Sequence, residues 1–534
     1  MKILEKLLKY RILTIFTHKN DNFEDKYVLK KDINIIISYF KKYTINDFEI
    51  FLKRYIISNK ILQEDDYSLL KNIFLIIQSN NNDFEKKEKL HHQRFIDRKN
   101  KINSTRKTQF ARSAYYMGSK ANLRSFILES LSSIKQSDYL YIDLMAGSGA
   151  MAGIFSDFGR TIASDAMQFP GYLSIVQGGG YSKNQAIDMI KKIKEHYILH
   201  YSELNIIYQD IMKEEDNFLK LDDTHKMALD YYNFLTNCSK YSNNLEKIIE
   251  RKTYPKKYPY ILFSEYFANI YFGINQSVQI DSLRYAIDNI DNQLDRSWAL
   301  GALIATCSKI ASSHAAHFAQ PIVLLDKNGD LKYNNIKKIL MKRRMSVWRE
   351  FEAVLLSLAE ESINVNNKIS YVDGPWHNTI KTIETKLENE RVIIYVDAPY
   401  TREEYRRYYH VLETLVKYNY PTICGKGKLL IKNTGERFSS EFFTKENRKI
   451  ENIFEKMFIE ILKKGWICAW SYSNNGIALM TKVINTISEN INCSISAYST
   501  PYFHKSQNKT IKTKKVEEYL ILFEPTLNIE TKSN

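Results

Sequence analysis

Short apolar runs, separated by stretches with helical periodicity, are the most regular pattern in the chain. The first two, YLYIDL at 139–144 and RTIASD at 160–165, enclose a helical pattern from about 150 to 158. Later runs follow at 369–373, 392–397, 466–472, 495–499 and 518–523. Runs of this length predict buried strands, and their alternation with helices predicts a mostly parallel sheet. The last two runs, joined by a polar, Lys-rich segment, suit a closing antiparallel pair.

Helical patterns fill most of the remaining chain. Several amphipathic helices with Asn- and Asp-rich breaks are indicated before residue 100, and helical patterns dominate from 181 to 360. The expected fold is therefore α/β, with a Rossmann-like sheet, a helical insertion between its two halves and an N-terminal helical lobe. We expect a lobe of unknown role at 1–110, the first half of the core at 111–180, the insertion at 181–385 and the second half of the core at 386–534.

Composition and charge favour a soluble protein that meets a polyanion. The 534 residues are 44% hydrophobic, enough for a sizeable core, and they have a formal net charge of +16. Such a charge attracts nucleic acid, although a bias of the whole proteome toward basic residues would produce the same excess. The cysteines are scattered singly without a C-x-x-C pair, so we expect reduced thiols, no metal site and a cytoplasmic location. Charges interrupt every apolar run at the N-terminus, so no membrane span is expected.

A glycine-rich segment follows the first predicted strand. It is DLMAGSGAMAG, from Asp143 to Gly153, and it leads into a predicted helix. Glycines at such a turn let the backbone pass close to a ligand, and Asp165, at the end of the next strand, suits the two ribose hydroxyls of an adenosine. Ordinary turn glycines are the alternative. The dinucleotide pattern G-x-G-x-x-G and the P-loop pattern are both absent, and GKGK at 425–428 lacks the P-loop spacing.

The strongest apolar run, VIIYV, is followed by DAPY at 397–400. An aromatic exocyclic amine is a poor nucleophile because its lone pair is delocalised into the ring. The Asp397 carboxylate and the Ala398 carbonyl can accept its two N–H bonds, which favours the nucleophilic form and stabilises the charge that develops during attack on a methyl group. Pro399 would stiffen the turn, and Tyr400 would stack on an extruded base. A plain turn is the alternative.

A second string of this kind, DGPW at 373–376, follows a shorter and more polar run. Gly374 would make its turn less rigid than that of DAPY. We therefore interpret DGPW as another strand end of the same sheet, where Trp376 packs and does not react.

A further segment, YYMGSK at 115–120, precedes the first strand and places Lys120 after a glycine. Its ammonium could pair with a cofactor carboxylate, while a solvated lysine is the alternative. YYMGSK, the glycine segment and DAPY, in this order, resemble the Dam-like group of DNA N6-adenine methyltransferases. The resemblance extends over roughly 112–525 and includes QSVQIDSLRYAIDNI, HFAQP, YRRYYHVLETLVKYNYP, SYSNNG and VEEYLILF. It implies a Rossmann-like methyltransferase sheet with a helical target-recognition insertion.

The resemblance also implies roles for individual residues. The cofactor, S-adenosyl-L-methionine, would be bound by Tyr116, Lys120, Asp143, Ala146, Gly147, Gly149, Asp165 and Asp397. The catalytic turn would consist of Asp397, Ala398, Pro399 and Tyr400. Ala398 replaces the first proline of the family pattern but keeps the carbonyl, and Met145 stands where an aromatic residue is usual. Neither change removes a functional group, so an active enzyme is expected.

These observations predict a site-specific adenine N6-methyltransferase that acts on a flipped base of double-stranded DNA, in restriction–modification or another defence against phage. A cognate restriction endonuclease or another subunit of the defence system is the expected partner. Base contacts would come from the insertion, with Arg284 and the cluster at 342–344 as candidates, and ordinary solvated charges as the alternative. Two other functions remain open, namely methylation of cytosine N4 or of RNA, and a catalytically silent DNA-binding or scaffold protein.

Overall fold

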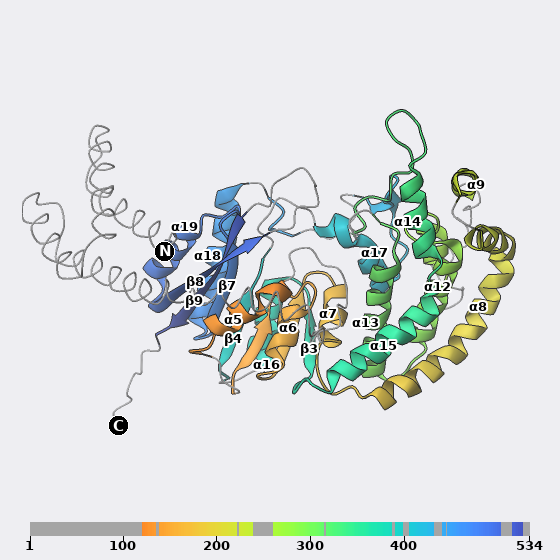
Figure 1. Ribbon diagram of the computed structural model, residues 1–534. Coiled ribbons are helices and arrows are strands. Elements are labelled where there is room, and N and C mark those ends of the chain that lie inside the picture. The colour runs from red at the N-terminus through yellow and green to blue at the C-terminus, as the bar shows by residue number, and fades with distance from the viewer. Residues whose placement is uncertain are drawn as a thin grey trace, which may run out of the picture.

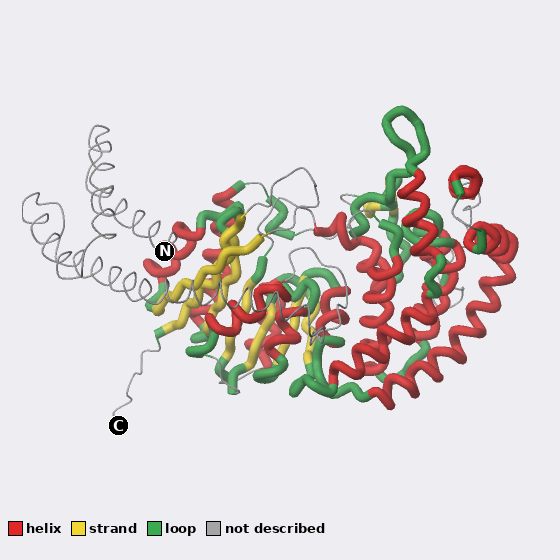
Figure 2. Tube along the Cα trace, in the orientation of Figure 1, coloured by secondary structure: helices red, strands yellow, loops and turns green. Residues whose placement is uncertain are grey.

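A computed structural model describes ten segments of the chain, which are 120–134, 138–221, 224–238, 260–313, 317–386, 390–398, 405–431, 440–444, 446–503 and 515–526. The lobe expected at 1–110 lies outside them, as do Tyr116, Pro399 and Tyr400 of the expected site. The described residues form a sheet flanked by helices and, beside it, a helical lobe (Figure 1, Figure 2).

All the predicted strands pair in one seven-stranded sheet with the order β3-β2-β1-β4-β7-β9-β8. The strands are β1 Leu140–Asp143, β2 Thr161–Asp165, β3 Ile369–Asp373, β4 Val392–Val396, β7 Ile467–Ser473, β8 Cys493–Phe503 and β9 Lys515–Pro525. The first five in sequence are parallel, whereas β9 runs antiparallel to both β7 and β8. The prediction of a closing antiparallel pair is confirmed. The order reverses at β1, as in other doubly wound sheets, and the architecture is a Rossmann-like methyltransferase fold.

Helices cover both faces of the sheet, which explains why β1, β4 and β7 are buried at every position. Along β4, Ile394 and Val396 pack on one side, and Ile393 and Tyr395 pack on the other. The first side carries α16 Trp376–Lys386, α18 Asn447–Lys463 and α19 Met480–Asn490, and the second carries η1 Lys120–Leu123, α5 Arg124–Ser130 and α6 Ala150–Phe155. Since successive side chains of a strand point to opposite faces, a strand buried on both sides loses the alternation of a half-exposed one.

The helical lobe packs against the sheet through α7 Phe169–Ile175, whose Phe169 and Leu173 belong to the core of the lobe. The other helices are α8 Lys183–Leu219, α9 His225–Cys238, α11 Leu262–Tyr266, α12 Ile274–Asp288, α13 Gln293–Ile310, α14 Tyr333–Arg343 and α15 Val347–Ser362. A Cβ atom on Gly301 of α13 would lie 2.7 Å from the Tyr172 carbonyl oxygen of α7, so the close approach of these helices needs a glycine. No helix within the described segments has both the length and the apolar character needed to cross a bilayer.

The structure corrects the boundary expected at 385/386. Strand β3 and helix α16 lie inside the expected insertion, yet β3 pairs with β2, so both belong to the sheet part. Conversely, α17 Tyr405–Lys417 and the hairpin of β5 Ile423–Cys424 and β6 Leu429–Leu430 follow β4 in sequence but pack with the helical lobe. An amphipathic pattern shows that a helix buries one face, and it does not show which core receives that face.

Candidate active site

The ends of the parallel strands bring the sequence motifs to one edge of the sheet. Asp143 ends β1 and pairs in register with Tyr395 of β4, so Asp397, two residues further along, lies beside the end of β1. Asp165 and Asp373 end β2 and β3 and are paired with each other. This edge, where the strand order reverses between β1 and β4, is the place at which open α/β sheets bind ligands.

The glycine segment forms a tight turn between β1 and α6. Gly147 and Gly149 have φ angles of 53° and 74°, a region that favours glycine. The Gly149 N–H donates to the Ala146 carbonyl over 2.8 Å, and a Cβ atom on Gly149 would lie 2.6 Å from the Ser174 Cα atom. The glycines are therefore required by the turn itself and by the approach of α7.

Asp165 is tied to this turn. Its Oδ2 atom accepts the Gly147 N–H over 3.1 Å, and its Oδ1 atom accepts the Met167 N–H over 3.0 Å. Burial raises the pKa of Asp165 to about 6, against the opposing effect of these backbone hydrogen bonds. A carboxylate offers about four lone-pair sites, so Asp165 keeps acceptor capacity for hydroxyl groups of a ligand.

Lys120 lies between two carboxylates at the carboxyl edge of β4. Its Nζ atom is 3.2 Å from Asp397 Oδ1 and 3.4 Å from Glu518 Oε2. The side chains of Lys120 and Glu518 are 4% and 1% exposed, whereas Asp397 is 18% exposed, so Asp397 is the member of the group that a ligand can reach. The resemblance implies that Lys120 binds the cofactor, which stays a prediction; in the structure its ammonium pairs with these two protein carboxylates.

Burial and neighbouring charges shift the titration of these carboxyl groups. Burial raises the pKa of Asp397 to about 6, while Lys120 lowers it and Glu518 raises it. The pKa of Asp143 rises to about 8, first because of burial and then because of the charge of Asp397. Asp143 Oδ2 also accepts the Ala152 N–H over 3.0 Å, which ties the end of β1 to the start of α6.

Sequence reasoning missed Glu518, although the pattern contained a signal. Glu518 is two and four residues before Leu520 and Leu522, which pack in the core beneath α5 and α6. Because side chains alternate along a strand, this places Glu518 on the inward face. A charged residue on an inward face, close to the start of an apolar strand, is a candidate for a site.

The DAPY turn, which the sequence predicts to be catalytic, is described as far as Ala398. The Ala398 side chain is 1% exposed and packs in the core between the sheet and α16, so the small residue fits the space and its carbonyl remains in the backbone. At the end of β3, the interpretation of DGPW as another strand end is confirmed. Trp376 is 5% exposed, packs in the same core and donates its indole N–H to Glu441.

Two of the arginines expected to face DNA are buried, so that expectation was wrong for them. Arg284 donates from Nε to the Leu415 carbonyl over 2.9 Å and pairs with Asp288, which fastens α12 to α17. Arg343 is 3% exposed and lies 3.6 Å from Glu215.

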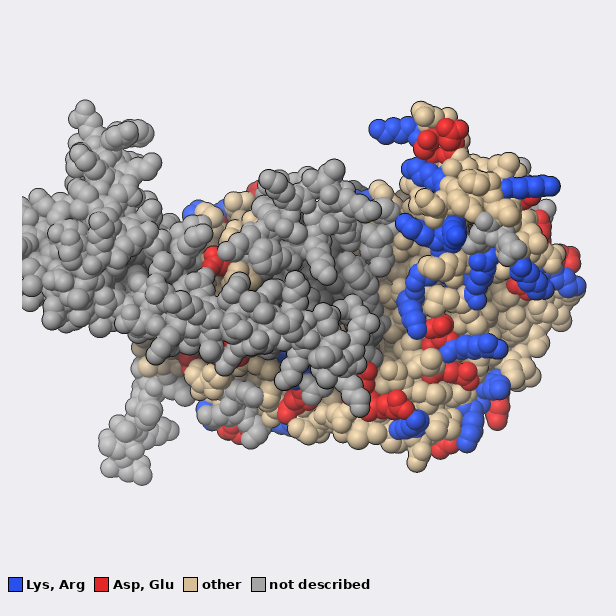
Figure 3. All heavy atoms as spheres, viewed as in Figure 1, with Lys and Arg blue, Asp and Glu red and all other residues tan. Residues whose placement is uncertain are grey.

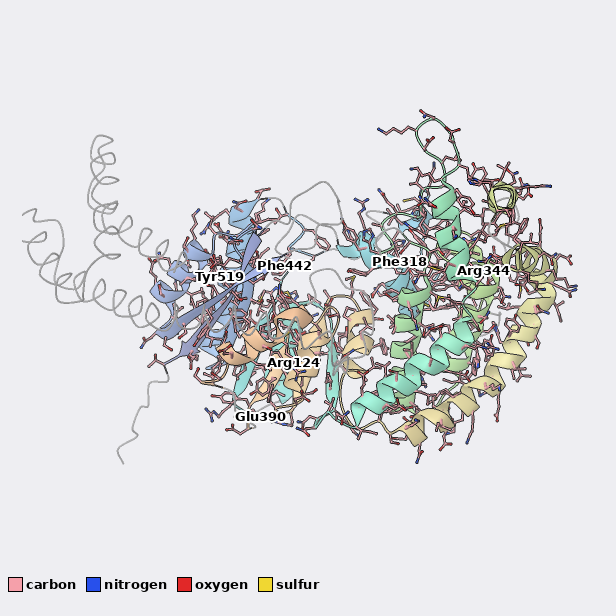
Figure 4. The ribbon with its side chains drawn as sticks, viewed as in Figure 1. Arg124, Phe318, Arg344, Glu390, Phe442 and Tyr519 are labelled. Carbon is pink, nitrogen blue, oxygen red and sulfur yellow. The ribbon has the colours of Figure 1, made fainter. Side chains whose placement is uncertain are left out.

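The remaining members of the basic cluster are nearer the surface. Arg344, marked in Figure 4, is exposed but donates to the Leu219 and Leu221 carbonyls at the end of α8. Lys342 is half-buried. The residues adjacent in sequence do not distinguish a buried arginine from a solvated one. The expectation that Arg284 and Arg343 face DNA was therefore wrong.

The fold and the carboxylate-bearing sheet edge define the class, a Rossmann-like α/β methyltransferase architecture. Within it, the chain is 21% identical over 429 residues to Modification methylase LlaI of Lactococcus lactis subsp. lactis, covering 78% of this chain and 55% of that protein. It is 22% identical over 434 residues to Type II methyltransferase M.FokI of Planomicrobium okeanokoites, covering 78% of this chain and 54% of that protein. The chain thus spans about half the length of these relatives. No family model matches the chain.

Proposed function

We propose that the protein is a site-specific DNA adenine N6-methyltransferase that uses S-adenosyl-L-methionine. The main support is the position of Asp397, partly exposed at the carboxyl end of β4 and beside the β1 end that leads into the glycine turn. The net charge of +16 suits a nucleic-acid substrate. Both relatives are named methylases or methyltransferases, and the name of one includes modification, which supports a role beside a restriction endonuclease.

The residues at the sheet edge fit the proposed cofactor. Asp165 would accept the ribose hydroxyls, and the backbone of Ala146 to Gly149 would lie along the amino-acid part. Asp397 and Glu518 are two carboxylates opposite the single ammonium of Lys120, so the site favours a cationic group. S-adenosylmethionine supplies a methyl group on a positively charged sulfonium.

Asp397 and Ala398 would activate the amine. The Asp397 carboxylate and the Ala398 carbonyl each accept one N–H of the adenine amine, which localises the nitrogen lone pair. As the N–C bond forms and the C–S bond breaks, positive charge grows on the nitrogen, and both acceptors stabilise it. The surplus proton then leaves to water. The reaction needs ionised Asp397, which a pKa of about 6 provides at neutral pH.

The hairpin at Gly425–Lys428 is our candidate for phosphate contacts. The Gly427 carbonyl accepts the Tyr271 hydroxyl over 3.1 Å and lies 3.0 Å from His410 Nε2, which fixes the turn against α17 and the lobe. Lys426 on this turn and Arg407 on α17 are exposed, and among the described residues neither has an ion-pair partner. Figure 3 shows further Lys and Arg side chains over the helical lobe, with Asp and Glu side chains between them. Such cations suit the DNA backbone.

The direct test supplies methyl-labelled S-adenosylmethionine and duplex DNA to the protein and digests the DNA to nucleosides. Label in N6-methyl-2′-deoxyadenosine supports the proposal, whereas label in N4-methyl-2′-deoxycytidine, or in RNA when RNA is supplied in place of DNA, identifies the alternative substrates. Absence of label on any nucleic acid, with the cofactor bound, would contradict it. Asp397→Ala separates an enzyme from a scaffold, because a scaffold keeps its DNA binding and its biological effect without the carboxylate.

A further inference from the structure

The ion-pair cluster of Lys120, Asp397 and Glu518 joins three distant parts of the chain at the proposed active site. Lys120 lies in η1, Asp397 follows β4, and Glu518 is on β9, 398 residues from Lys120. Glu518 pairs in register with Ser473 of β7 and Thr500 of β8, so the sheet holds its position on both sides. Figure 4 marks its neighbour Tyr519 on this strand.

We propose that Glu518 is a positioning residue, which holds the Lys120 ammonium against one oxygen of Asp397 and leaves the other oxygen for the amine. This rests on the proposed function. Lys120 Nζ approaches Asp397 at Oδ1, and among the described residues Oδ2 has no hydrogen-bond partner. An ammonium donates three hydrogen bonds, so Lys120 can bind both carboxylates at once.

The balance of charge explains why a second carboxylate is useful. With Asp397 as its single partner, a buried ammonium would concentrate its attraction on that carboxylate and make it a weaker acceptor for the amine. Glu518 shares this attraction. Among the described residues, the other ionisable groups coupled to Asp397 are Asp143 from β1 and Tyr395 from β4, and neither is cationic.

The substitution Glu518→Gln removes the charge and keeps the size. It leaves one ammonium opposite one carboxylate, so no buried charge loses its last partner and the protein is expected to fold. We expect kcat to fall roughly tenfold while KM for the cofactor changes less, because the effect acts through Asp397. The acid limb of the pH profile should move to lower pH by roughly one unit, since a like charge nearby raises a carboxyl pKa. Glu518→Asp should restore most of the activity and the wild-type profile.

Glu524→Gln is the matched control. Glu524 lies on the same strand and the same face, six residues further along β9, and it pairs with Ser494 near the start of β8. Glu524 therefore lies at the opposite end of the strands from Asp397. Its substitution should leave kcat and the pH profile unchanged.

A second measurement does not depend on methyl transfer. The free energy of unfolding is measured across roughly pH 4 to 8 for four proteins, which are the wild type, Asp397→Asn, Glu518→Gln and the double variant. The difference that Asp397→Asn makes, with Glu518 and without it, reports the pH at which Asp397 titrates in each background. The pH at which Asp397 titrates should be lower without Glu518. If it is the same in both backgrounds, the inference is wrong, whatever the activity. If instead the wild type transfers no methyl group while the titration shifts, the proposed function fails and the electrostatic coupling stands.

Discussion

Asp281 in the helical lobe and Asp397 at the sheet edge differ in how fully the protein satisfies their carboxylates. Asp281 in the lobe is completely buried and accepts the Phe263 N–H, the Ser264 N–H and the Ser264 hydroxyl over 2.8, 2.8 and 2.7 Å. The Tyr418 hydroxyl donates to it as well. At the sheet edge, Lys120 is the one cation paired with Asp397 within the described segments, and it also pairs with Glu518.

This difference is the one expected between a structural carboxylate and the carboxylate of the proposed active site. Asp281 uses its acceptor sites on fixed donors and connects α11, α12 and the segment after α17. Asp397 is partly exposed and keeps an oxygen without a described partner. A carboxylate that remains incompletely satisfied costs stability, and such a cost is expected where a ligand completes the hydrogen bonding.

The largest effect is expected for Asp397→Ala. Loss of the acceptor should lower the rate of methyl transfer by roughly 10² to 10³-fold or more, as for other groups that stabilise developing charge. The unfolding midpoint should change little by comparison. Single-turnover transfer from labelled cofactor, together with urea unfolding, measures both, and near-normal transfer would remove Asp397 from the mechanism.

Asp281→Asn should show the opposite profile. The amide has one acceptor oxygen and two N–H donors, so it leaves buried donors such as the Tyr418 hydroxyl unpaired. We expect a loss of about 3 kcal/mol in the free energy of unfolding. Under conditions where the variant is folded, kcat should stay within about twofold of the wild type. If Asp281→Asn loses methyl transfer but keeps its stability, Asp281 is not a purely structural carboxylate.

The pH dependence should report the titration of Asp397. The raised pKa means that the folded protein holds this proton more tightly than the unfolded chain, and the amine acceptor forms when the proton leaves. kcat/KM should therefore increase with pH up to about 6 and level off above it. A profile that is flat between roughly pH 5 and 8 would show that the pKa of Asp397 lies outside this range.

The smallest effect is expected at the hairpin. Lys426→Gln should weaken binding of cognate and unrelated duplexes alike and reduce the slope of log affinity against log salt concentration by roughly 1. Lys456→Gln, on the exposed surface of α18 in the sheet part, is the control and should leave the slope unchanged. An unaltered slope in Lys426→Gln would place the DNA on another surface.

Much of the sheet and its motifs could be predicted from the chain alone. The seven apolar runs, the turn at Gly147 and Gly149, and the strand ends at Asp165 and Asp397 depend on local periodicity and turn chemistry, which adjacent residues determine. The pairing of Lys120 with Asp397 and Glu518 could not be predicted in this way. It depends on the register of β9 and on the position of η1 against the sheet.

The sequence by itself thus determined the type of sheet, the order of its motifs and the residues with chemistry suited to amine methylation. The tertiary structure decided that Arg284 and Arg343 are buried, that β3 belongs to the sheet and α17 to the helical lobe, and that Glu518 lies beside Lys120. The physical reason is the distance along the chain over which each effect acts. Hydrophobic periodicity acts over a few residues, whereas burial of a charge depends on groups hundreds of residues away, which come together when the whole core packs.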